Sequence, residues 1–479
     1  MAKQYLSLLS KEDLQKIHHA SLSILQNTGM LIDHYEARKM IRAAGADVED
    51  EKKIVKFPPE LVEKCLKAIP RRLLYAGRNL ENDIILQADG GIYARTASSL
   101  TSYLDLETRR YRRGTIDDLN QWTALADALP NIHCCGTNHA EDVPAQTADI
   151  HATRVLLSNQ RKHFFAASFS VKNLKYMIEM ALTVRGSKEA FKKRPLFHSL
   201  IGIISPLSIP EDDVNMLFLA GEFGVPMIVC SEPNVGATGP ITLAGTIAQT
   251  NAEFLGASTL AQIIHPGIGI PYYLLPTVFD MSTGRALLGS PENALIQAAL
   301  CQLGSEFYRL PVEISALCAD GVISEQIIFQ KASATLMASL SGANLLCHAG
   351  TIDTALAASP VHLVIDDEIM AVMHRMWQGI EVNHDTLGLD AIARIGPLGN
   401  FLTDPHTLKY LRSEEHFRPT IFDRDSSQAW YAKGSKRLEQ RAREKALDIL
   451  AKHEVEPLPE EVQRELRAIV SKADQELIK

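Results

Sequence analysis

The stretch CSEPNVGATGP, residues 230–240, places two glycines, an asparagine and two prolines directly after the apolar run VPMIVC. Such a loop can cradle a phosphate, carry catalytic residues or form a tight turn. A P-loop is disfavoured because no Gly-Lys-Ser/Thr follows, and the glycine spacing does not match G-x-G-x-x-G. We interpret it as a tight loop that lines a pocket, with Glu232 and Asn234 as candidate binding residues and the next helix starting at Thr242.

The adjacent residues Cys134 and Cys135, in HCCGTNH, raise the question of a zinc site. Neighbouring residues of a strand point to opposite faces, so the two thiols cannot easily bind one ion. The chain has seven cysteines, an odd number, without a C-x-x-C pair. Neither a disulfide framework nor a Cys-rich zinc site is therefore expected, and we expect no metal.

Two charged clusters have structural interpretations. In VIDDEI, Asp366 is placed to cap a helix, with Asp367 and Glu368 in the first turn, where carboxylates are favoured. The basic run RRYRRG (109–113 with Gly114) reads as a solvated hairpin edge, although it could also contact an acidic partner.

Composition excludes several classes of protein. The net charge of −8 argues against a primary role in nucleic-acid or membrane binding. No apolar run reaches the roughly 18 residues that span a bilayer, and the N-terminal residues lack the pattern of a signal peptide. We expect a cytoplasmic protein.

The elements that must position these residues change in type along the chain. Residues 11–75 read as helical, with Ser10 as N-cap and Gly29 at the end of the first helix, and residues 73–113 read as a small antiparallel β element. From about residue 115, short apolar runs alternate with amphipathic stretches, as in βα units. The seven runs are 132–137, 163–168, 196–205, 226–231, 270–276, 312–317 and 344–350.

Seven such units favour a (β/α)8 TIM barrel, an α/β fold, over a doubly wound sheet. The candidate for the eighth strand is LVID, residues 363–366. We expect residues 1–114 to form an N-terminal helical and β-hairpin elaboration, residues 115–425 the barrel, and residues 426–479 charged C-terminal helices.

Several long blocks resemble the trimethylamine methyltransferase family. They are LDLETRRYRRGTIDDL (104–119), LADALPNIH (125–133), GATGPITLAGTIAQTNAEFLGASTLAQIIHPG (236–267), FDMSTG (279–284), VIDDEIMAVMHRMWQGIEVN (364–383) and IGPLGNFLTDPHTLKYLRSEEHFRPTIFDR (395–424). The blocks agree in order and spacing from about residue 10 to about residue 455. The resemblance implies a (β/α)8 barrel that transfers a methyl group from an N-methylated amine.

The resemblance also implies that the methyl acceptor is the Co(I) corrinoid of a separate small corrinoid-binding protein, so that this chain holds no tightly bound cofactor. Founding members use pyrrolysine in the loop after the sixth expected strand, where this chain has the standard residues SALCADGVISEQ (315–326). The family pattern is only loosely kept there, through Asp320, Glu325 and Gln326. In this respect the chain resembles the demethylases of quaternary amines such as glycine betaine, proline betaine, carnitine and γ-butyrobetaine.

Chemistry supports this branch, because a quaternary ammonium leaves as a neutral amine and needs no acid or covalent activator. It needs a cation site, in-line geometry and exclusion of water. The alternatives are a tertiary-amine methyltransferase, a zinc-dependent thiol methyltransferase, and a betaine-binding barrel without catalysis. We expect no nucleic-acid or membrane partner, and a homo-oligomer.

A cation of this kind is bound by aromatic faces. The fifth expected strand supplies Tyr272, Tyr273 and Phe279, and alternation allows only one of the two tyrosines to face the lumen. Further candidate rings are Tyr93, Phe169 and Phe197, although each could be an ordinary core residue.

Histidines recur at strand ends, at His139, His198 and His348. They could bind a substrate carboxylate or steady the leaving amine. Arg95 is another candidate, unless it is a charge on the β surface. By their position after adjacent strands, His348 and the loop around Asp320 are expected to border the transferred methyl and are the candidate catalytic residues.

Overall fold

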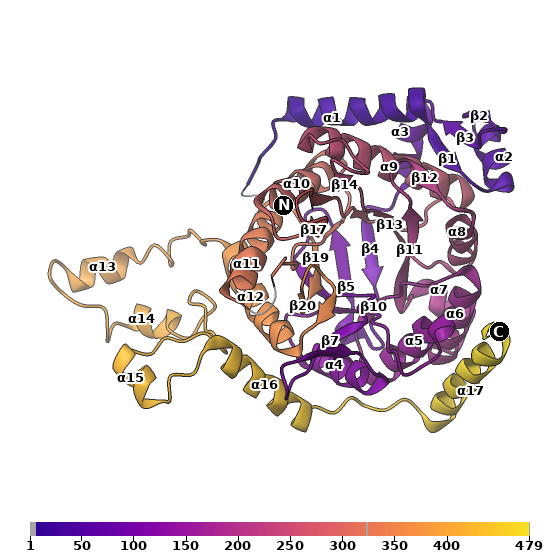
Figure 1. The fold of residues 1–479 in the computed structure, drawn as a ribbon. Helices are drawn as coiled ribbons and strands as arrows, with labels where there is room; N and C mark the ends of the chain where they lie inside the picture. The colour runs from indigo at the N-terminus through magenta and orange to yellow at the C-terminus, as the bar shows by residue number, and fades with distance from the viewer. Residues whose placement is uncertain (1–5, 322–323, 479) are drawn as a thin grey trace.

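The computed structural model describes residues 6–321 and 324–478. At its centre, eight parallel strands follow one another in the order β13, β11, β10, β9, β6, β19, β18 and β15 (Figure 1). The strands are β6 (Tyr93–Thr96), β9 (Cys134–Gly136), β10 (His163–Phe165), β11 (Phe197–Ile203), β13 (Met227–Ser231), β15 (Tyr272–Tyr273), β18 (Val312–Ile314) and β19 (Leu345–Ala349).

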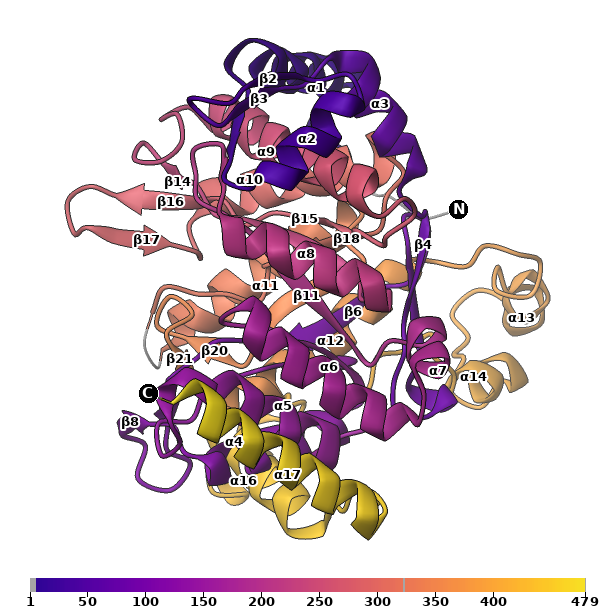
Figure 2. The ribbon, with the colours of Figure 1, turned by 90° about the vertical axis from the view of Figure 1, so that its right-hand side faces the viewer.

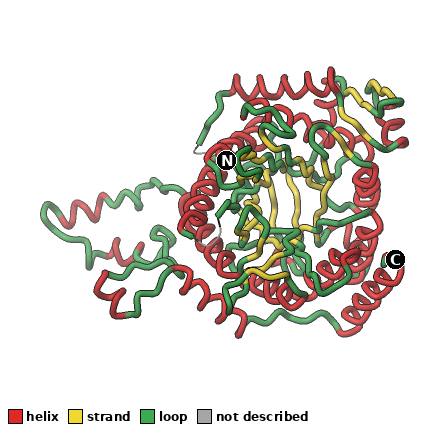
Figure 3. Tube along the Cα trace, viewed as in Figure 1, coloured by secondary structure: helices red, strands yellow, loops and turns green. Residues whose placement is uncertain are grey.

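Two backbone hydrogen bonds join the ends of this sheet. The amide of Met227 donates to the carbonyl of Gly269 over 3.0 Å, and the amide of Leu275 donates to that of Ser231 over 3.0 Å. Helices surround the strands on the outside (Figure 3). The expected (β/α)8 barrel is therefore confirmed, and all seven apolar runs contain barrel strands.

The eighth strand was wrongly placed at residues 363–366. These residues lie inside helix α12 (Pro360–Gln378), which Ser359 caps and Pro360 opens. The barrel is instead completed by β6, which pairs in parallel with β19 and β9. Its residues Tyr93–Thr96 fall in the region that we had read as antiparallel. The N-cap assignment of Asp366 was also wrong, because Asp366 lies in the middle of α12.

The helices on the outside begin at capping residues that can be recognised in the sequence. Thr115 and Asp118 form a capping box at the start of α4, and Ser170 and Ser290 cap α6 and α10. The barrel helices are α4 (Ile116–Ala128), α5 (Ala148–Asn159), α6 (Val171–Arg185), α7 (Lys188–Lys193), α8 (Glu211–Phe223), α9 (Leu243–Ile264), α10 (Pro291–Gln302), α11 (Glu325–Leu340) and α12.

Helix α9 begins after Thr242, as expected, and is buried around most of its circumference. The reason is the N-terminal layer, whose helices α1 (Lys11–Ser23) and α3 (Pro59–Ala68) pack on its outer face. Ser10 caps α1, as predicted. The rest of this layer comprises β1 (Met30–Ile32), α2 (Tyr35–Ala43), β2 (Asp47–Glu49) and β3 (Ile54–Lys56), with β12 (Ser208–Ile209) added at its edge.

The two ends of the barrel differ (Figure 2). The antiparallel hairpin β4 (Arg72–Tyr75) and β5 (Ile84–Gln87) lies at the N-terminal end of the strands. Its side chains join a cluster of buried residues inside the barrel, the lumen cluster, which consists of Leu73, Tyr75, Ile84, Leu86, Cys134, Phe165, Ile228, Tyr273, Leu275, Leu288, Cys318, Leu345 and Cys347. The C-terminal end carries two small sheets. They are formed by β14 (Asn234–Val235), β16 (Thr277–Asp280) and β17 (Arg285–Leu287), and by β7 (Ser102–Leu104), β8 (Tyr111–Arg113), β20 (Thr351–Ile352) and β21 (Ala357–Ala358).

The C-terminal part runs back along the outside of the barrel. Helix α16 (Leu438–Lys452) packs on α12 and α4, and α17 (Glu460–Leu477) packs on α5 and α6. Between α12 and α16, the short helices α13 (Leu389–Ile395), α14 (Pro405–Tyr410) and α15 (Ser427–Ala432) project away from the barrel (Figure 1). Within the described ranges, no helix has both the length and the apolar character needed to cross a membrane.

Candidate functional site

The lower half of the lumen is filled by a polar cluster. Tyr75, from β4, stacks on the rings of His163 and His198, with centroids 4.3 and 4.5 Å away, and its hydroxyl donates to Glu313. Nε2 of His163 lies 3.0 Å from Nδ1 of His198, whose Nε2 is 3.7 Å from the Glu313 carboxylate. The candidate His198 is therefore buried in a closed cluster near the start of its strand.

Burial decides the charges of this cluster. It lowers the pKa of His163 to about 3 and that of His198 below its ordinary value, so both rings are neutral at physiological pH. Burial also raises the pKa of Glu313 to about 7, although Arg95 and the Tyr75 hydrogen bond oppose the rise. Tyr75, His163 and Glu313 hydrogen-bond within the chain, which favours a structural role, although Nε2 of His198 has no hydrogen bond among the described residues.

Arg95 occupies the middle of the lumen, so the alternative of a β-surface charge was wrong. Its guanidinium lies over the ring of Phe165, 4.6 Å from the centroid, and is almost fully buried. Burial opposes its charge, but Cys347, Tyr273 and Glu313 nearby raise its pKa. Its Nη1 donates a long hydrogen bond of 3.4 Å to the carbonyl of Thr96, and its Nε has no partner in the described structure.

The two tyrosines of β15 point in opposite directions, as expected from strand alternation. Tyr273 belongs to the lumen cluster, and its hydroxyl lies 3.3 Å from the Ser315 hydroxyl. Tyr272 faces outward, where it donates to Asn251 of α9 over 2.9 Å and packs on Phe254. Tyr273 is thus the ring that can contribute to a lumen site.

Towards the C-terminal end, the lumen opens. Ala167, Leu200 and Cys230 border the lumen cluster and are partly exposed. By contrast, His163, four residues before Ala167, and His198, two residues before Leu200, are fully buried. Two residues beyond Leu200, β11 has Gly202, whose amide donates to the carboxylate of Asp213 over 2.5 Å, and this carboxylate occupies the space that a side chain at Gly202 would enter.

Glu232 lies at this open end, directly after β13. Its side chain is exposed, yet burial among surrounding protein atoms raises its pKa. Both observations are compatible if the carboxyl lines a recess that water enters. The thiol of Cys230 donates to it over 3.1 Å, and Tyr273 is close enough for the two groups to interact electrostatically.

Asn234 organises the loop that carries Glu232. Its carbonyl accepts hydrogen bonds from the amides of Ala237, Thr238 and Gly239, and its side-chain oxygen accepts one from Thr277 over 2.6 Å. The loop of residues 230–240 is therefore a braced turn at the C-terminal face. Asn234 therefore stabilises the loop through its backbone carbonyl and its side-chain oxygen.

His348 stands at a bulge near the end of β19. Its φ is 75°, a left-handed conformation that is unusual for a residue other than glycine, and its Nδ1 is buried without a partner in the described structure. Burial, together with the positive charges of Arg95 and Lys331, lowers its pKa to about 3. Strain and an unsatisfied ring atom are features that cluster at functional sites.

A buried ion pair braces the turn behind His348. Lys331 of α11 donates to Asp366 of α12 over 2.6 Å, with both side chains inaccessible to solvent. The same carboxylate accepts the amide of Gly350 over 2.6 Å. The ion pair therefore fixes the strand end that carries the imidazole.

Asp320 has its oxygens occupied by hydrogen bonds. It accepts the amides of Leu288 and Gly289 over 2.5 and 2.9 Å, and a bond from Gln330 over 3.3 Å. The β18 loop is tied to the β20–β21 turn through Ala319 and Gly321, so Asp320 and His348 do lie on neighbouring loops. Residues 322 and 323 of this loop lie outside the described residues.

The remaining candidates are scattered. His139 follows β9, with its ring 4.8 Å from that of the exposed Phe169, and burial lowers its pKa to about 4. Tyr93 starts β6 and packs edge-on against His133, at the lower end. Phe279 is partly exposed on the β16–β17 hairpin, and Phe197 packs outside the barrel on Phe164.

Sequence reasoning missed Glu313, Tyr75 and the pair of Lys331 with Asp366. For Glu313 a signal was present, because a carboxylate inside the apolar run VEISAL is costly to bury without partners. The sequence gives no such signal for Tyr75, because it lies far along the chain from the strands whose side chains it contacts.

The positions of the thiols bear on the question of a zinc site. Cys134 belongs to the lumen cluster and Cys135 to the core outside the strands, so the two point apart. Among the residues that the structure describes, no group of three or more His, Cys, Asp or Glu side chains is arranged to hold a metal ion.

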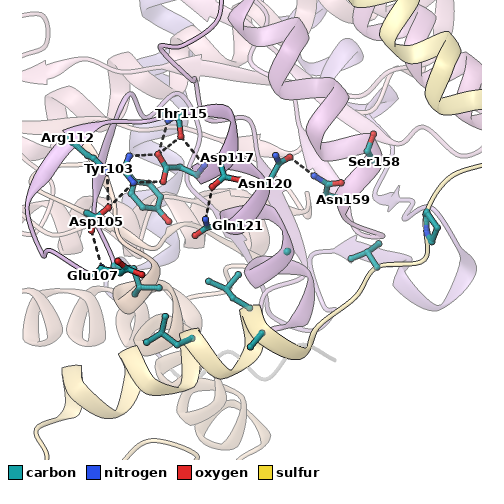
Figure 4. A pocket seen from close by; sticks show the side chains of 18 of the residues that line it. Tyr103, Asp105, Glu107, Arg112, Thr115, Asp117, Asn120, Gln121, Ser158 and Asn159 are labelled. Atoms are coloured by element: carbon teal, nitrogen blue, oxygen red, sulfur yellow. Dashed lines mark hydrogen bonds and ion pairs between the residues drawn. The ribbon is translucent and has the colours of Figure 1, made fainter. Parts of the chain in front are cut away.

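A cavity of about 1050 Å³ lies outside the barrel, between α4, the β7–β8 hairpin and the segment that joins α16 to α17 (Figure 4). Arg112 pairs there with Asp105 and Asp118, at 2.9 and 2.7 Å. All three residues of strand β8, part of RRYRRG, are exposed, and β8 is the edge strand of its sheet, which confirms the hairpin edge. This cavity contains none of the candidate residues and is separate from the lumen.

Comparison with known proteins shows the family. The model of the trimethylamine methyltransferase (MTTB) family matches residues 2–477. The chain is 32% identical to trimethylamine methyltransferase MttB of Desulfitobacterium hafniense (strain DSM 10664 / DCB-2), over 98% of this chain and 94% of that protein. It is 30% identical to glycine betaine methyltransferase of Desulfitobacterium hafniense (strain Y51), over 98% of both chains.

Solved structures agree on the fold. Monomethylamine methyltransferase (MtmB) of Methanosarcina barkeri superposes with a TM-score of 0.51 at 12% identity, over 93% of this chain and 94% of that one. This likeness shows that the two share the barrel architecture. Because the family model and the relatives both cover almost the whole sequence, the chain belongs to the trimethylamine methyltransferase family and is a methyltransferase.

Proposed function

We propose that this enzyme transfers a methyl group from a quaternary amine, of the betaine class, to the Co(I) corrinoid of a separate small protein. The observation that carries the proposal is Glu232, an exposed carboxyl directly after β13 at the C-terminal end of the lumen, with Tyr273 on the neighbouring strand β15. A carboxylate and an aromatic face together attract an organic cation that has no hydrogen to donate.

The charge of Glu232 supports a cationic ligand. Its hydrogen-bond partner, the thiol of Cys230, carries no positive charge, so burial raises the pKa of the carboxyl. A bound ammonium favours the ionised form and recovers part of that cost. The relative named glycine betaine methyltransferase shows that the family includes an enzyme for such a compound.

Arg95 provides a place for the other end of a betaine. It is a buried cation without a close ion pair among the described residues, and it lies near Tyr273 in the middle of the lumen. A carboxylate that reaches Arg95 points inward, which directs the ammonium outward to Glu232. In this orientation the N-methyl groups face the open end of the barrel, where a partner can approach.

The chemistry fits the residues at this end. The carbon–nitrogen bond of the ammonium breaks, its electron pair stays on nitrogen, and a neutral tertiary amine leaves. The partner's Co(I) corrinoid supplies the nucleophile for the methyl group. No proton is needed, and the lowered pKa of His348 keeps its imidazole neutral, so we assign it to orienting the substrate rather than to acid catalysis.

The rim of the open end suits a docking partner. Exposed apolar side chains follow the barrel strands there, at Phe169, Ile204, Ile241, Met281 and Leu356. Ile241 and Met281 both border Gly236 in the loop that carries Glu232. Exposed apolar groups gathered around a site commonly mark protein contacts, and we assign this rim to the corrinoid protein.

The test is a methyl-transfer assay with a corrinoid protein reduced to Co(I), followed by its visible spectrum. Glycine betaine, proline betaine, carnitine and γ-butyrobetaine are compared with trimethylamine. We expect methylation with at least one betaine and none with trimethylamine. Trimethylamine turnover without betaine turnover favours the tertiary-amine alternative, and betaine binding without methylation favours a sensor.

Two variants test the site in the same assay. Glu232→Gln keeps the shape of the side chain but removes its charge, and is expected to lower kcat/KM roughly 10-fold to 100-fold. His348→Ala is expected to depress methyl transfer in a protein with wild-type thermal stability. Wild-type kinetics in both variants contradict the proposed site.

A further inference from the structure

One face of helix α9 holds the loop that carries Glu232. Gln249 and Glu253 are four residues apart on this helix, so they lie on the same side of it, and both side chains are buried. The side-chain amide of Gln249 donates to the carbonyl of Thr238, in the far half of the loop, over 2.9 Å. It also donates to Glu253 over 3.1 Å, which links the two side chains to each other.

The carboxylate of Glu253 accepts hydrogen bonds from two different segments at the C-terminal end of the barrel. One oxygen accepts the hydroxyl of Ser231, the residue directly before Glu232. The same oxygen accepts the hydroxyl of Ser205 over 2.8 Å, and the other oxygen accepts the amide of Leu207 over 2.9 Å. Both of these donors belong to the loop after β11. One buried carboxylate therefore joins the loop after β11 to the end of β13.

Packing alone does not account for a carboxylate at position 253. The side chain is fully buried, and uncharged donors surround it, namely two hydroxyls, a backbone amide and the amide of Gln249. Burial of a carboxylate is costly unless hydrogen bonds compensate for the lost water. An apolar side chain would fill the same position without that cost. What a carboxylate adds is two oxygens that can accept bonds from both segments at once.

The two segments that Glu253 joins have different tasks in the proposed function. The end of β13 leads directly to Glu232, the proposed contact of the ammonium. The loop after β11 begins with Ile204, whose side chain is 63% exposed on the rim that we assign to the corrinoid protein. In the same loop, Leu207 has a φ of 59°, a left-handed conformation that residues other than glycine rarely adopt. The hydrogen bond from its amide to Glu253 helps to hold the loop in this conformation.

We propose that Glu253 is a positioning residue that fixes the ammonium contact relative to the rim where the methyl acceptor docks. In-line transfer requires that the acceptor, the methyl carbon and the leaving nitrogen be aligned, and a misplacement of about 1 Å can cost about 100-fold in rate. Glu232 locates the ammonium and the rim locates the acceptor, so a group that is bonded to both segments controls this alignment. Glu253 acts from α9, outside the barrel strands. This positioning role rests on the proposed function.

Two serine variants form a matched pair, because each removes one hydroxyl from the same oxygen of Glu253. Ser231→Ala loosens the segment that carries Glu232 and is expected to raise the KM for the betaine roughly 3-fold to 10-fold, with the KM for the corrinoid protein unchanged. Ser205→Ala loosens the rim and is expected to show the reverse, a raised KM for the corrinoid protein and an unchanged KM for the betaine. The measurement is the methyl-transfer assay, with each substrate varied in turn.

Two variants of Glu253 test the carboxylate itself. Glu253→Leu removes every acceptor, and is expected to raise both KM values and to lower kcat roughly 10-fold to 100-fold. Glu253→Gln keeps the shape of the side chain. Its oxygen can accept the bonds from Leu207 and Gln249, and its amide can donate to the two serine hydroxyls. It is therefore expected to recover most of the activity that Glu253→Leu loses.

Thermal stability is measured for every variant, and the serine pair decides if Glu253→Leu does not fold. A merely structural role lowers the stability of both serine variants and leaves both KM values as in the wild type, which overturns the proposal. Equal rises of the betaine KM in the two variants overturn it as well. Glu232→Gln separates this failure from a failure of the proposed function. If Glu232→Gln is impaired and Ser231→Ala is not, only the positioning role is wrong, whereas wild-type kinetics in both contradict the site itself.

Discussion

In the lower half of the barrel lumen, polar side chains contact one another, whereas towards the upper end the side chains that border the lumen are partly exposed. The hydroxyl of Tyr75 donates to Glu313, and its ring covers two histidines. At the other end, Glu232 is exposed, and Nδ1 of His348 has no partner among the described residues. Both halves contain residues whose types could do chemistry.

The difference separates structural from functional polar groups. A buried polar group costs free energy unless it is hydrogen-bonded. In the lower half most of that cost is met within the chain, although Nε2 of His198 has no hydrogen bond among the described residues, and the β4–β5 hairpin lies at this end. In the upper half it is left unmet at Nδ1 of His348 among the described residues, which is an arrangement that a ligand can complete. The predictions below test this division.

The largest effect is expected at the ion pair behind His348. Lys331→Met leaves Asp366 buried without a counter-charge and is expected to lower the free energy of unfolding by about 3–5 kcal/mol. The measurement is unfolding in urea. The double variant Lys331→Met/Asp366→Leu, which removes both charges, is expected to recover much of the loss. If the single variant loses less than about 1 kcal/mol, the pair does not brace the turn.

The next effect concerns the pH dependence of the lower cluster. Burial raises the pKa of Glu313 from its ordinary 4.5 to about 7, so the folded state binds this proton more tightly than the unfolded state. The resulting stability is fully present below about pH 4.5 and is lost as the pH rises through about 7. The loss amounts to roughly 3 kcal/mol at most.

Comparison of the wild type with Glu313→Gln isolates this carboxyl. The lowered pKa values of His163 and His198 act in the opposite direction, with stability gained as the pH rises towards 6.5. Because both proteins keep these histidines, the difference between their unfolding free energies follows Glu313. A difference that stays constant between pH 5 and pH 8 contradicts the raised pKa.

Most of the fold was predictable from local patterns. Buried parallel strands are apolar on both faces, and each of the seven apolar runs contains a barrel strand. β6 was missed because it has four residues, one of them Arg95, and its partners lie more than 30 residues away in one direction and about 250 in the other. Nothing in so short a segment distinguishes it from an antiparallel strand.

Asp366 and its neighbours were misread for a similar reason. Three consecutive acidic residues usually mark the start of a helix. Here they lie in the middle of one, because Lys331 pairs with Asp366 and the amide of Asn131 donates to Asp367. These partners come from elements far along the chain, which a local pattern cannot reveal.

The site was predictable in part. Strand alternation required one tyrosine of β15 to face the lumen, but only the register of the sheet selects Tyr273. The loop at Glu232 was expected at the C-terminal face because of its position after a strand. The lumen position of Arg95 and the lower position of His198 depend on strand boundaries that the sequence does not define.

The smallest effect is expected at Tyr273 in the upper half. Tyr273→Leu keeps the apolar volume but removes the aromatic face, and is expected to weaken betaine binding by about 1–2 kcal/mol, measured by calorimetry. Tyr75→Phe is the matched control, because it alters an aromatic residue of the lower half without touching the recess. It is expected to lower thermal stability and leave binding unchanged. If Tyr75→Phe weakens binding as much as Tyr273→Leu does, the two halves of the lumen are coupled and the division between structural and functional polar groups fails. If neither variant weakens it more than about twofold, the cation is bound elsewhere in the upper lumen, with Glu232 as the remaining anchor.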